Sequence, residues 1–157
     1  MRHAKSSWND ENLSDFERPL NDRGLRTAPF MGKFMREKGY EPSIIFSSPA
    51  VRAKQTAELV KNAAGFSCEI RFDERIYEAS PRTLLQVASE VDYAHESAML
   101  VGHNPGMEGF IRLLTDNLEP LPTATLAVID LDINKWNEVV DGCGKLRNIV
   151  RPKGEMI

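Results

Sequence analysis

The stretch Ile44-Ile45-Phe46-Ser47-Ser48-Pro49-Ala50-Val51-Arg52 is typical of a buried strand that leads directly into a helix. Its first three residues form a short apolar run with β-branched side chains, the pattern of a strand covered on both faces. Ser48 is a helix-capping residue, and proline suits the first helical position because its missing N–H would be unpaired there. We therefore expect a helix from about Ala50 to Ala64, ended by Gly65.

The same alternation of strand and helix recurs along the chain. Residues 69–72 and 98–101 are two further expected strands. Each is followed by an amphipathic helical pattern, the first after Ser80-Pro81 and the second around Met107 and Phe110. Another helical pattern begins at Asn21 and ends at Gly39. Pro29 lies inside it and should kink this helix or delay its start.

The last part of the chain has a different pattern. Residues 126–132 and 136–140 are expected to form two strands joined by a tight turn at Asn134, a hairpin at the edge of the sheet. We therefore expect an α/β fold with three layers: a mainly parallel sheet, helices on both faces and a C-terminal β-hairpin at the edge. Residues 1–157 should form one domain.

Composition and charge exclude several functional classes. The 157 residues carry a formal net charge of -3, so nothing in the bulk charge favours nucleic acid or anionic lipid. Cys68 and Cys143 are the only cysteines, too few for a disulfide framework or a cysteine metal site. No apolar run is long enough for a membrane span, and no secretory signal is present. We expect a cytoplasmic protein.

Two of the expected strands end in residues suited to an anion. In an open parallel sheet, ligands bind outside the carboxyl ends of the strands, where helix N-termini present unpaired N–H groups. Arg52 lies in the first turn of one such helix, and His103 immediately precedes another. A guanidinium can hold two phosphate oxygens, and a histidine can add a charge-assisted hydrogen bond. The sequence predicts a phosphate site at this edge.

Four motifs together give a resemblance to a known family. They are Arg2-His3 at the start, Arg18-Pro19-Leu20-Asn21-Asp22-Arg23-Gly24, Ser47-Ser48-Pro49 followed by Arg52 and Gln55-Thr56, and Gly102-His103-Asn104-Pro105-Gly106. As an ordered set they resemble the histidine phosphatase superfamily. The start Arg2-His3-Ala4-Lys5-Ser6-Ser7-Trp8 and the short chain most resemble its small SixA-type phosphohistidine phosphatase branch. The resemblance extends to about Asp132.

The resemblance implies roles for the principal site residues. His3 would attack the phosphoryl group and carry it as a phosphohistidine, which water then hydrolyses. Arg2, Arg52 and His103 would bind the phosphoryl oxygens. A neutral imidazole is an adequate nucleophile near neutral pH, and two arginines with a histidine can stabilise the transferring group. We therefore expect neither a metal nor another cofactor.

Secondary roles fall to four other residues. Asn9 and Ser6 are candidates for phosphate contact. Glu78 is the candidate general acid that would protonate the leaving group, with Glu74 as a competing candidate. A phosphoramidate such as phosphohistidine needs a strong acid less than an alkyl ester does, so Glu78 could be dispensable.

One feature departs from the family pattern. Relatives place a central strand immediately before the Arg-His pair, whereas only Met1 precedes Arg2 in this sequence. Either the natural chain starts upstream of Met1 or the sheet has a gap. We expect the first.

The expected function is a metal-independent phosphatase that acts on a phosphohistidine-bearing protein. No long insertion is present to enclose a metabolite, which favours a phosphorylated side chain as substrate. The alternatives are a small-molecule phosphomonoester phosphatase of the same superfamily and a non-catalytic phosphate-binding module. The sequence does not specify an oligomeric state.

Overall fold

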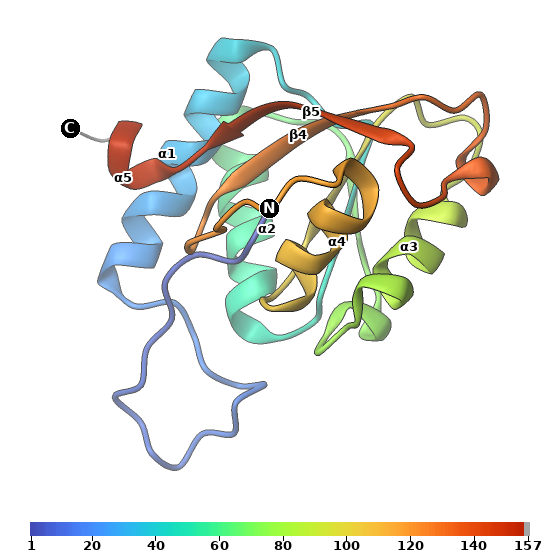
Figure 1. The fold of residues 1–157 in the computed structure, drawn as a ribbon. Coiled ribbons are helices and arrows are strands. Elements are labelled where there is room, and N and C mark those ends of the chain that lie inside the picture. The colour runs from blue at the N-terminus through green and yellow to red at the C-terminus, as the bar shows by residue number, and fades with distance from the viewer. Residues whose placement is uncertain (156–157) are drawn as a thin grey trace.

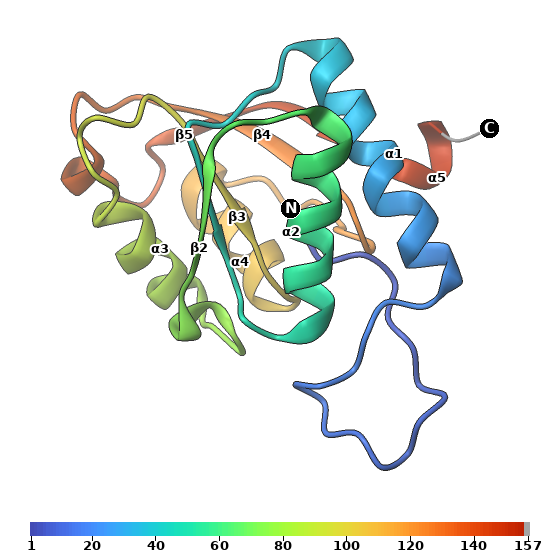
Figure 2. The same cartoon turned by 180° about the vertical axis from the view of Figure 1, so that it is seen from behind.

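A computed structural model describes residues 1–155 of the chain. Its centre is a parallel sheet of three strands in the order β2-β1-β3, namely Ile44–Ser47 (β1), Glu69–Phe72 (β2) and Ala98–Val101 (β3). β1 lies in the middle, and all four of its residues are buried. This confirms the expectation of a strand covered on both faces. In Figure 2, β2 and β3 of this sheet are labelled between the helices, and Figure 1 shows the molecule from the opposite side.

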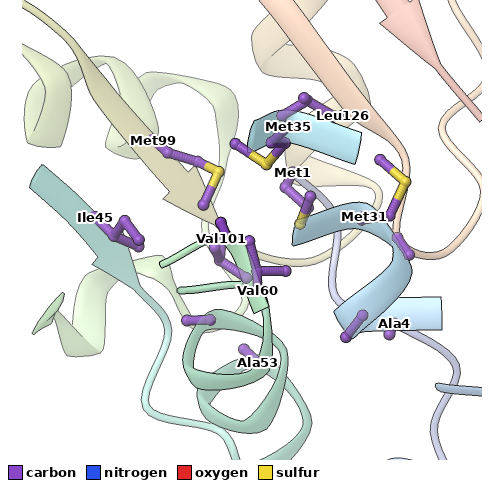
Figure 3. Close-up of a cluster of buried hydrophobic side chains, with 14 of the residues drawn as sticks. Met1, Ala4, Met31, Met35, Ile45, Ala53, Val60, Met99, Val101 and Leu126 are labelled. Atoms are coloured by element: carbon purple, nitrogen blue, oxygen red, sulfur yellow. The ribbon is translucent and has the colours of Figure 1, made fainter. Parts of the chain in front are cut away.

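Helices cover both faces of the sheet, as the sequence predicts. Asp22–Lys38 (α1) and Val51–Ala64 (α2) lie on one face, and Pro81–Ser89 (α3) and Gly106–Thr115 (α4) on the other (Figure 2). Because side chains alternate across a strand, Ile45 of β1 packs towards α1 and α2, whereas Ile44 and Phe46 pack towards α3 and α4. Figure 3 shows part of the first cluster, including Ile45, Met99 and Val101.

The first helix begins at Asp22 and continues through Pro29, so the proline does not delay its start. Asn21 caps it by accepting a hydrogen bond from the Gly24 amide, and Gly39 ends it in the left-handed conformation. Position 24 has no room for a side chain, because a Cβ there would lie 2.2 Å from the carbonyl oxygen of Lys5. α1 can therefore pack directly against the N-terminal segment.

The second sheet corrects one expectation. Leu126–Leu131 (β4) pairs antiparallel with Gly144–Val150 (β5), not with residues 136–140. Trp136–Glu138 (η2) forms a short 3₁₀ helix, because the indole N–H of Trp136 donates to the carbonyl of His95 and its ring packs against the α3–α4 cluster. The apolar pattern of this segment reflects packing rather than strand pairing.

The N-terminal residues lie between the two sheets. The Gly102 amide donates to Met1, and the His3 amide donates to Gly102, so the segment lies parallel to the end of β3. On its other side the Arg2 amide donates to Thr125, just before β4. His3 is thus held at the carboxyl edge of the parallel sheet.

Two short helices complete the described elements, Glu74–Ile76 (η1) before α3 and Pro152–Glu155 (α5) after β5. Within residues 1–155, none of the helices combines the length and the apolar composition that crossing a membrane requires.

Candidate active site

His3 is buried, with 7% of its surface exposed, and backbone bonds fix it on both sides. Its amide donates to Gly102, and its carbonyl accepts from Ala124. The ring nitrogen Nδ1 lies 2.7 Å from the carbonyl oxygen of Ala4, which can only accept a hydrogen bond. Nδ1 therefore carries the proton in the neutral ring, and Nε2 keeps the lone pair. This is the tautomer that a nucleophile attacking through Nε2 requires.

Helix α2 positions the segment that carries His3. The Thr56 hydroxyl donates to the Arg52 carbonyl and accepts from the Ala4 amide at 2.9 Å. At the preceding position, the side-chain carbonyl of Gln55 accepts from the Leu20 amide at 2.8 Å. Thr56 and Gln55 thus tie the two N-terminal motifs to the helix that also carries Arg52.

Arg52 is 6% exposed, and its guanidinium is already hydrogen-bonded to a carboxylate. Its two terminal nitrogens donate to the carbonyl of Asp15 at 2.6 Å and to the carboxylate of Asp15 at 2.9 Å. The same carboxylate accepts from the Tyr77 hydroxyl at 2.7 Å and from Arg18 at 2.9 Å. These bonds, led by that from Tyr77, lower the pKa of Asp15 to about 2, so Asp15 is an anion at neutral pH.

His103 lies against His3, with their ring centroids 5.0 Å apart. Its Nε2 is 2.8 Å from the Ser48 hydroxyl, while its Nδ1 is buried without a hydrogen-bond partner among the described residues. Ser48 does not cap α2 as expected, because its hydroxyl lies between His103 and the Ala50 amide; the capping residue is Ala50. Tyr77 closes the other side of the His103 ring with an edge contact at 5.5 Å.

Arg2 completes the group. One terminal nitrogen donates to the Leu121 carbonyl at 3.1 Å, and its Nε is buried without a partner in the described part of the chain. The loop that contains Leu121 is held by Glu108, which accepts from the Leu121 amide and from the Asn104 side chain. A buried donor without a partner is costly, so Arg2 Nε is suited to a ligand oxygen.

The electrostatics favour a neutral nucleophile beside two cations. Burial, together with the charges of Arg2 and Arg52, lowers the pKa of His3 to about 3 and that of His103 to about 4. Both imidazoles are therefore uncharged at neutral pH, while the guanidiniums keep their charge. Such a site can bind a tetrahedral dianion and offer it a nitrogen lone pair.

Comparison with known proteins gives this arrangement a family. The sequence model of the histidine phosphatase superfamily (branch 1) matches residues 1–86, more than half of the chain. The chain belongs to the histidine phosphatase superfamily. Together with the SixA structures described next, this membership supports a phosphatase of the histidine phosphatase type.

Solved structures and curated proteins agree with this assignment. SixA of Agrobacterium tumefaciens, a candidate phosphohistidine phosphatase, is 30% identical and superposes with a TM-score of 0.83 over 97% of this chain and 95% of its own. A protein histidine phosphatase SixA solved with tungstate shares the fold, with a TM-score of 0.80 at 20% identity over 99% of this chain and 96% of its own. An uncharacterised protein of Mycobacterium tuberculosis is 31% identical over 93% of this chain and 96% of its own. The chain is of the SixA type.

The structure brings together four of the residues predicted for this histidine phosphatase site: His3, His103, Arg2 and Arg52. The secondary phosphate candidates are placed differently. Ser6 is buried, and its hydroxyl accepts a hydrogen bond from Arg18. Asn9 is exposed in the loop of residues 7–20, and no hydrogen bond among the described residues joins it to the site. A phosphate contact from either residue stays a prediction.

The two acid candidates lie between β2 and α3: Glu74 begins the short helix η1, and Glu78 follows it in the chain. Glu74 and Glu78 are both exposed, but only Glu78 follows Tyr77, whose ring contacts His103. Glu78 also has a φ of 54°, a left-handed conformation that is uncommon for a residue with a side chain. Which of the two carboxylates donates a proton stays a prediction.

Three residues at this phosphatase site were not predicted: Asp15, Tyr77 and Thr56. The sequence does contain an indication for Thr56, because Thr56 belongs to the motif quoted around Arg52. No sequence pattern indicates Asp15 and Tyr77. They are 62 positions apart in the chain and meet only because the loop of residues 7–20 folds over Arg52. Gly106 in the His103 motif has a steric explanation: a Cβ there would lie 2.2 Å from the Ala79 carbonyl oxygen.

Proposed function

We propose that this phosphatase removes the phosphoryl group from a phosphohistidine on a protein, through a covalent intermediate on His3. In the first step Nε2 of His3 forms a bond to phosphorus while the bond from phosphorus to the substrate imidazole breaks. In the second step a water oxygen bonds to phosphorus and the bond to Nε2 breaks, releasing inorganic phosphate. The observation that carries this proposal is the bond between Nδ1 of His3 and the Ala4 carbonyl, which leaves Nε2 as the nucleophile.

The remaining residues neutralise the charge of the transferring phosphoryl group and hold it in position. Arg2 and Arg52 neutralise the oxygens of the transferring group, and His103 can add a hydrogen bond through Nδ1. The leaving imidazole nitrogen takes up a proton, which solvent or Glu78 can supply. No step needs a metal ion, and we expect activity to survive a chelator.

A protein substrate is supported by the surroundings of the site. Trp8, 73% exposed, stacks on the guanidinium of Arg18 at 3.2 Å from the ring centroid. Phe16, 38% exposed, meets Tyr77 edge-on at 5.1 Å. Exposed aromatic side chains are enriched where proteins bind one another, and here they lie beside Arg52 and its partners. The A. tumefaciens neighbour, a candidate phosphohistidine phosphatase, supports the same substrate class. The cytoplasm remains the compartment we propose.

The test compares kcat/KM for a phosphohistidine-bearing phosphotransfer protein with that for aryl and sugar phosphates, in a chelating buffer. We expect the phosphoprotein to have the higher kcat/KM. His3→Ala should lower it by at least about a thousandfold. The matched control is His95→Ala, which removes a histidine outside the site and should leave kcat/KM unchanged. Higher kcat/KM on a small ester would instead identify a small-molecule phosphatase, and activity indifferent to His3 would contradict the mechanism.

A further inference from the structure

A single carbonyl holds the guanidinium of Arg2. Among the described residues, the only hydrogen bond that this side chain makes runs from a terminal nitrogen to the Leu121 carbonyl, at 3.1 Å. Its Nε is buried without a partner in the same part of the chain. An arginine side chain is long and has many rotamers, so its direction depends on where its acceptor lies. The N–H groups that Arg2 can offer to a ligand are therefore set by the position of Leu121.

Two side chains fix the Leu121 peptide on both sides. Its amide donates to the carboxylate oxygen Oε1 of Glu108 at 2.8 Å. Its carbonyl accepts from the side-chain nitrogen of Asn104 at 2.9 Å, and the same nitrogen donates to Oε1 of Glu108 at 2.9 Å. Glu108, Asn104 and Leu121 thus form a closed ring of hydrogen bonds, which we call the Leu121 clamp. A shift of the Leu121 carbonyl would strain or break the bonds of this ring.

The Leu121 clamp joins the His103 motif to Arg2. Asn104 directly follows His103 in the chain, and Glu108 lies in the first turn of α4. Oδ1 of Asn104 accepts from the Glu108 amide at 3.3 Å, while Nδ2 faces two acceptors. A flipped side-chain amide would point Oδ1 at those two oxygens, so only this orientation satisfies every group.

The rest of the loop between α4 and β4 contacts the same part of the active site. The Ala124 amide donates to the His3 carbonyl at 3.0 Å, and the Thr125 carbonyl accepts from the Arg2 amide at 3.1 Å. Ala124 has a φ of 61°, a left-handed conformation that is uncommon for a residue with a side chain. Such a conformation persists only where its surroundings hold it. Residues 121–125 thus align the backbone of His3 and the side chain of Arg2 together.

We propose that Glu108 is a positioning residue for the phosphatase reaction, which sets the direction of the Arg2 guanidinium through Asn104 and the Leu121 carbonyl. The inference rests on the proposed role of Arg2 as a ligand of the phosphoryl oxygens. Glu108 makes no hydrogen bond to Arg2 among the described residues, so it acts through the Leu121 clamp. Its charge also acts at longer range: burial lowers the pKa of Arg2, and the carboxylate of Glu108 opposes this shift.

The first test separates the hydrogen bonds of Glu108 from its charge. Glu108→Ala removes both bonds to the carboxylate, whereas Glu108→Gln keeps an accepting oxygen in the place of Oε1 and loses the charge. With an aryl phosphate as substrate, we expect Glu108→Ala to lower kcat/KM at least about tenfold and to raise the inhibition constant of inorganic phosphate at least about fivefold. Glu108→Gln should bring both values back to within about threefold of the unmodified chain. No loss in Glu108→Ala, or an equal loss in Glu108→Gln, would overturn the proposal.

Thr115→Val is the control for a loss of stability. Thr115 lies at the other end of α4, and its hydroxyl donates to the Ile111 carbonyl of the same helix at 2.7 Å. We expect this variant to lower Tm and to leave the inhibition constant of phosphate unchanged. If phosphate inhibition weakens in Thr115→Val as much as in Glu108→Ala, the effect of Glu108 is a loss of helix stability and the proposal is wrong.

A double-mutant cycle tests whether Glu108 acts through Arg2. Adding Glu108→Ala to Arg2→Ala should change kcat/KM less than about twofold, and a further loss as large as in the unmodified chain would overturn the proposal. The same cycle separates this inference from the proposed function. Unchanged kcat/KM in Arg2→Ala would overturn the role of Arg2 and this inference with it. A loss in Arg2→Ala without one in Glu108→Ala would overturn this inference alone. The aryl phosphate readout does not depend on phosphohistidine being the natural substrate.

Discussion

At the scale of single residues, the proposed anion-binding group already contains an anion, the carboxylate of Asp15. Arg52 would hold substrate oxygens, yet its terminal nitrogens donate to Asp15. Asp15 is half-exposed, so its bond to Arg52 can exchange with a bound group. A substrate phosphate must therefore displace this carboxylate or share the guanidinium with it.

Replacing Asp15 should strengthen anion binding. In Asp15→Asn the negative charge beside Arg52 is lost, so we expect the inhibition constant of inorganic phosphate to fall several-fold. Competitive inhibition of aryl phosphate hydrolysis measures it. Asp10→Asn is the matched control, because Asp10 lies in the same loop and bonds only its own turn. Weaker phosphate inhibition in Asp15→Asn would show that Asp15 orients Arg52 rather than competing for it.

The role of Glu78 should depend on the leaving group. An alkyl phosphate expels a poor leaving group that needs a proton, whereas phosphohistidine expels an imidazole. We expect Glu78→Gln to lower kcat on an alkyl phosphate about a hundredfold and to change kcat on phosphohistidine protein less than about threefold. Glu74→Gln, in the same loop, is the control and should affect neither. Equal losses on both substrates from Glu78→Gln would contradict a role as proton donor.

At the scale of elements, one hydroxyl on α2 couples that helix to the nucleophile segment. Thr56 accepts from the Ala4 amide, next to His3. Thr56→Val leaves this buried amide without a partner, so we expect a loss of about 1–3 kcal/mol in unfolding free energy together with a lower kcat. Thr27→Val is the matched control, since Thr27 is also buried and bonds only a carbonyl of its own helix. Equal effects of the two variants in denaturant titration and turnover would rule out the coupling.

The elements of the parallel sheet were predictable because their patterns are local. Ser80 caps α3, and Gly39 and Gly65 end α1 and α2, each in agreement with its sequence signal. The second sheet was not predictable in the same way. Trp136 and Val139 give residues 136–140 an apolar pattern, but these side chains pack against the α3–α4 cluster and do not belong to a strand. The true partner, β5, lies beyond a turn at residues 141–142, and no short-range signal joins it to β4.

The residues of the candidate site also differ in how far the sequence could predict them. Arg52 and His103 could be predicted from local patterns, because one lies in the first turn of a helix and the other just after a strand, and a parallel sheet brings such positions to one edge. His3 was predicted only through the family resemblance of the Arg2-His3 motif. Asp15 and Tyr77 could not be predicted, because their contact depends on how a long loop folds. Ser48 was assigned to a cap on local grounds, whereas its tertiary contact with His103 determines its hydrogen bond.

At the scale of the whole molecule, three buried basic groups make stability depend on pH. The folded protein lowers the pKa of the Met1 amine from 8.0 to about 5 and those of His3 and His103 from 6.5 to about 3 and about 4. In the unfolded chain these groups take up protons at their ordinary values. The unfolded state therefore binds more protons as pH falls, and folding is weakened.

We expect the unfolding free energy to fall from pH 8 to pH 5, by at most about 1.4 kcal/mol per pH unit for each group. Only the amine contributes above pH 6.5, and all three groups contribute below it. Asp15, with its pKa near 2, adds nothing in this window. Denaturant titration at several pH values measures the slope. Acetylation of the Met1 nitrogen removes the contribution of the amine. The unfolding free energy of the acetylated chain should therefore be nearly constant above pH 6.5 and should still fall below it, through His3 and His103. A flat profile in the unmodified chain would contradict the burial of these groups.

The most direct test of the account is the location of the phosphoryl group in a quenched reaction. The protein is mixed with a radiolabelled phosphoryl donor, quenched in alkali and fragmented, and the labelled residue is identified by mass spectrometry. The account predicts label on Nε2 of His3 and no label in His3→Ala. The label should disappear when excess unlabelled donor is added before the quench. Label on His103, or turnover without any labelled histidine, would contradict the assignment of His3 as nucleophile.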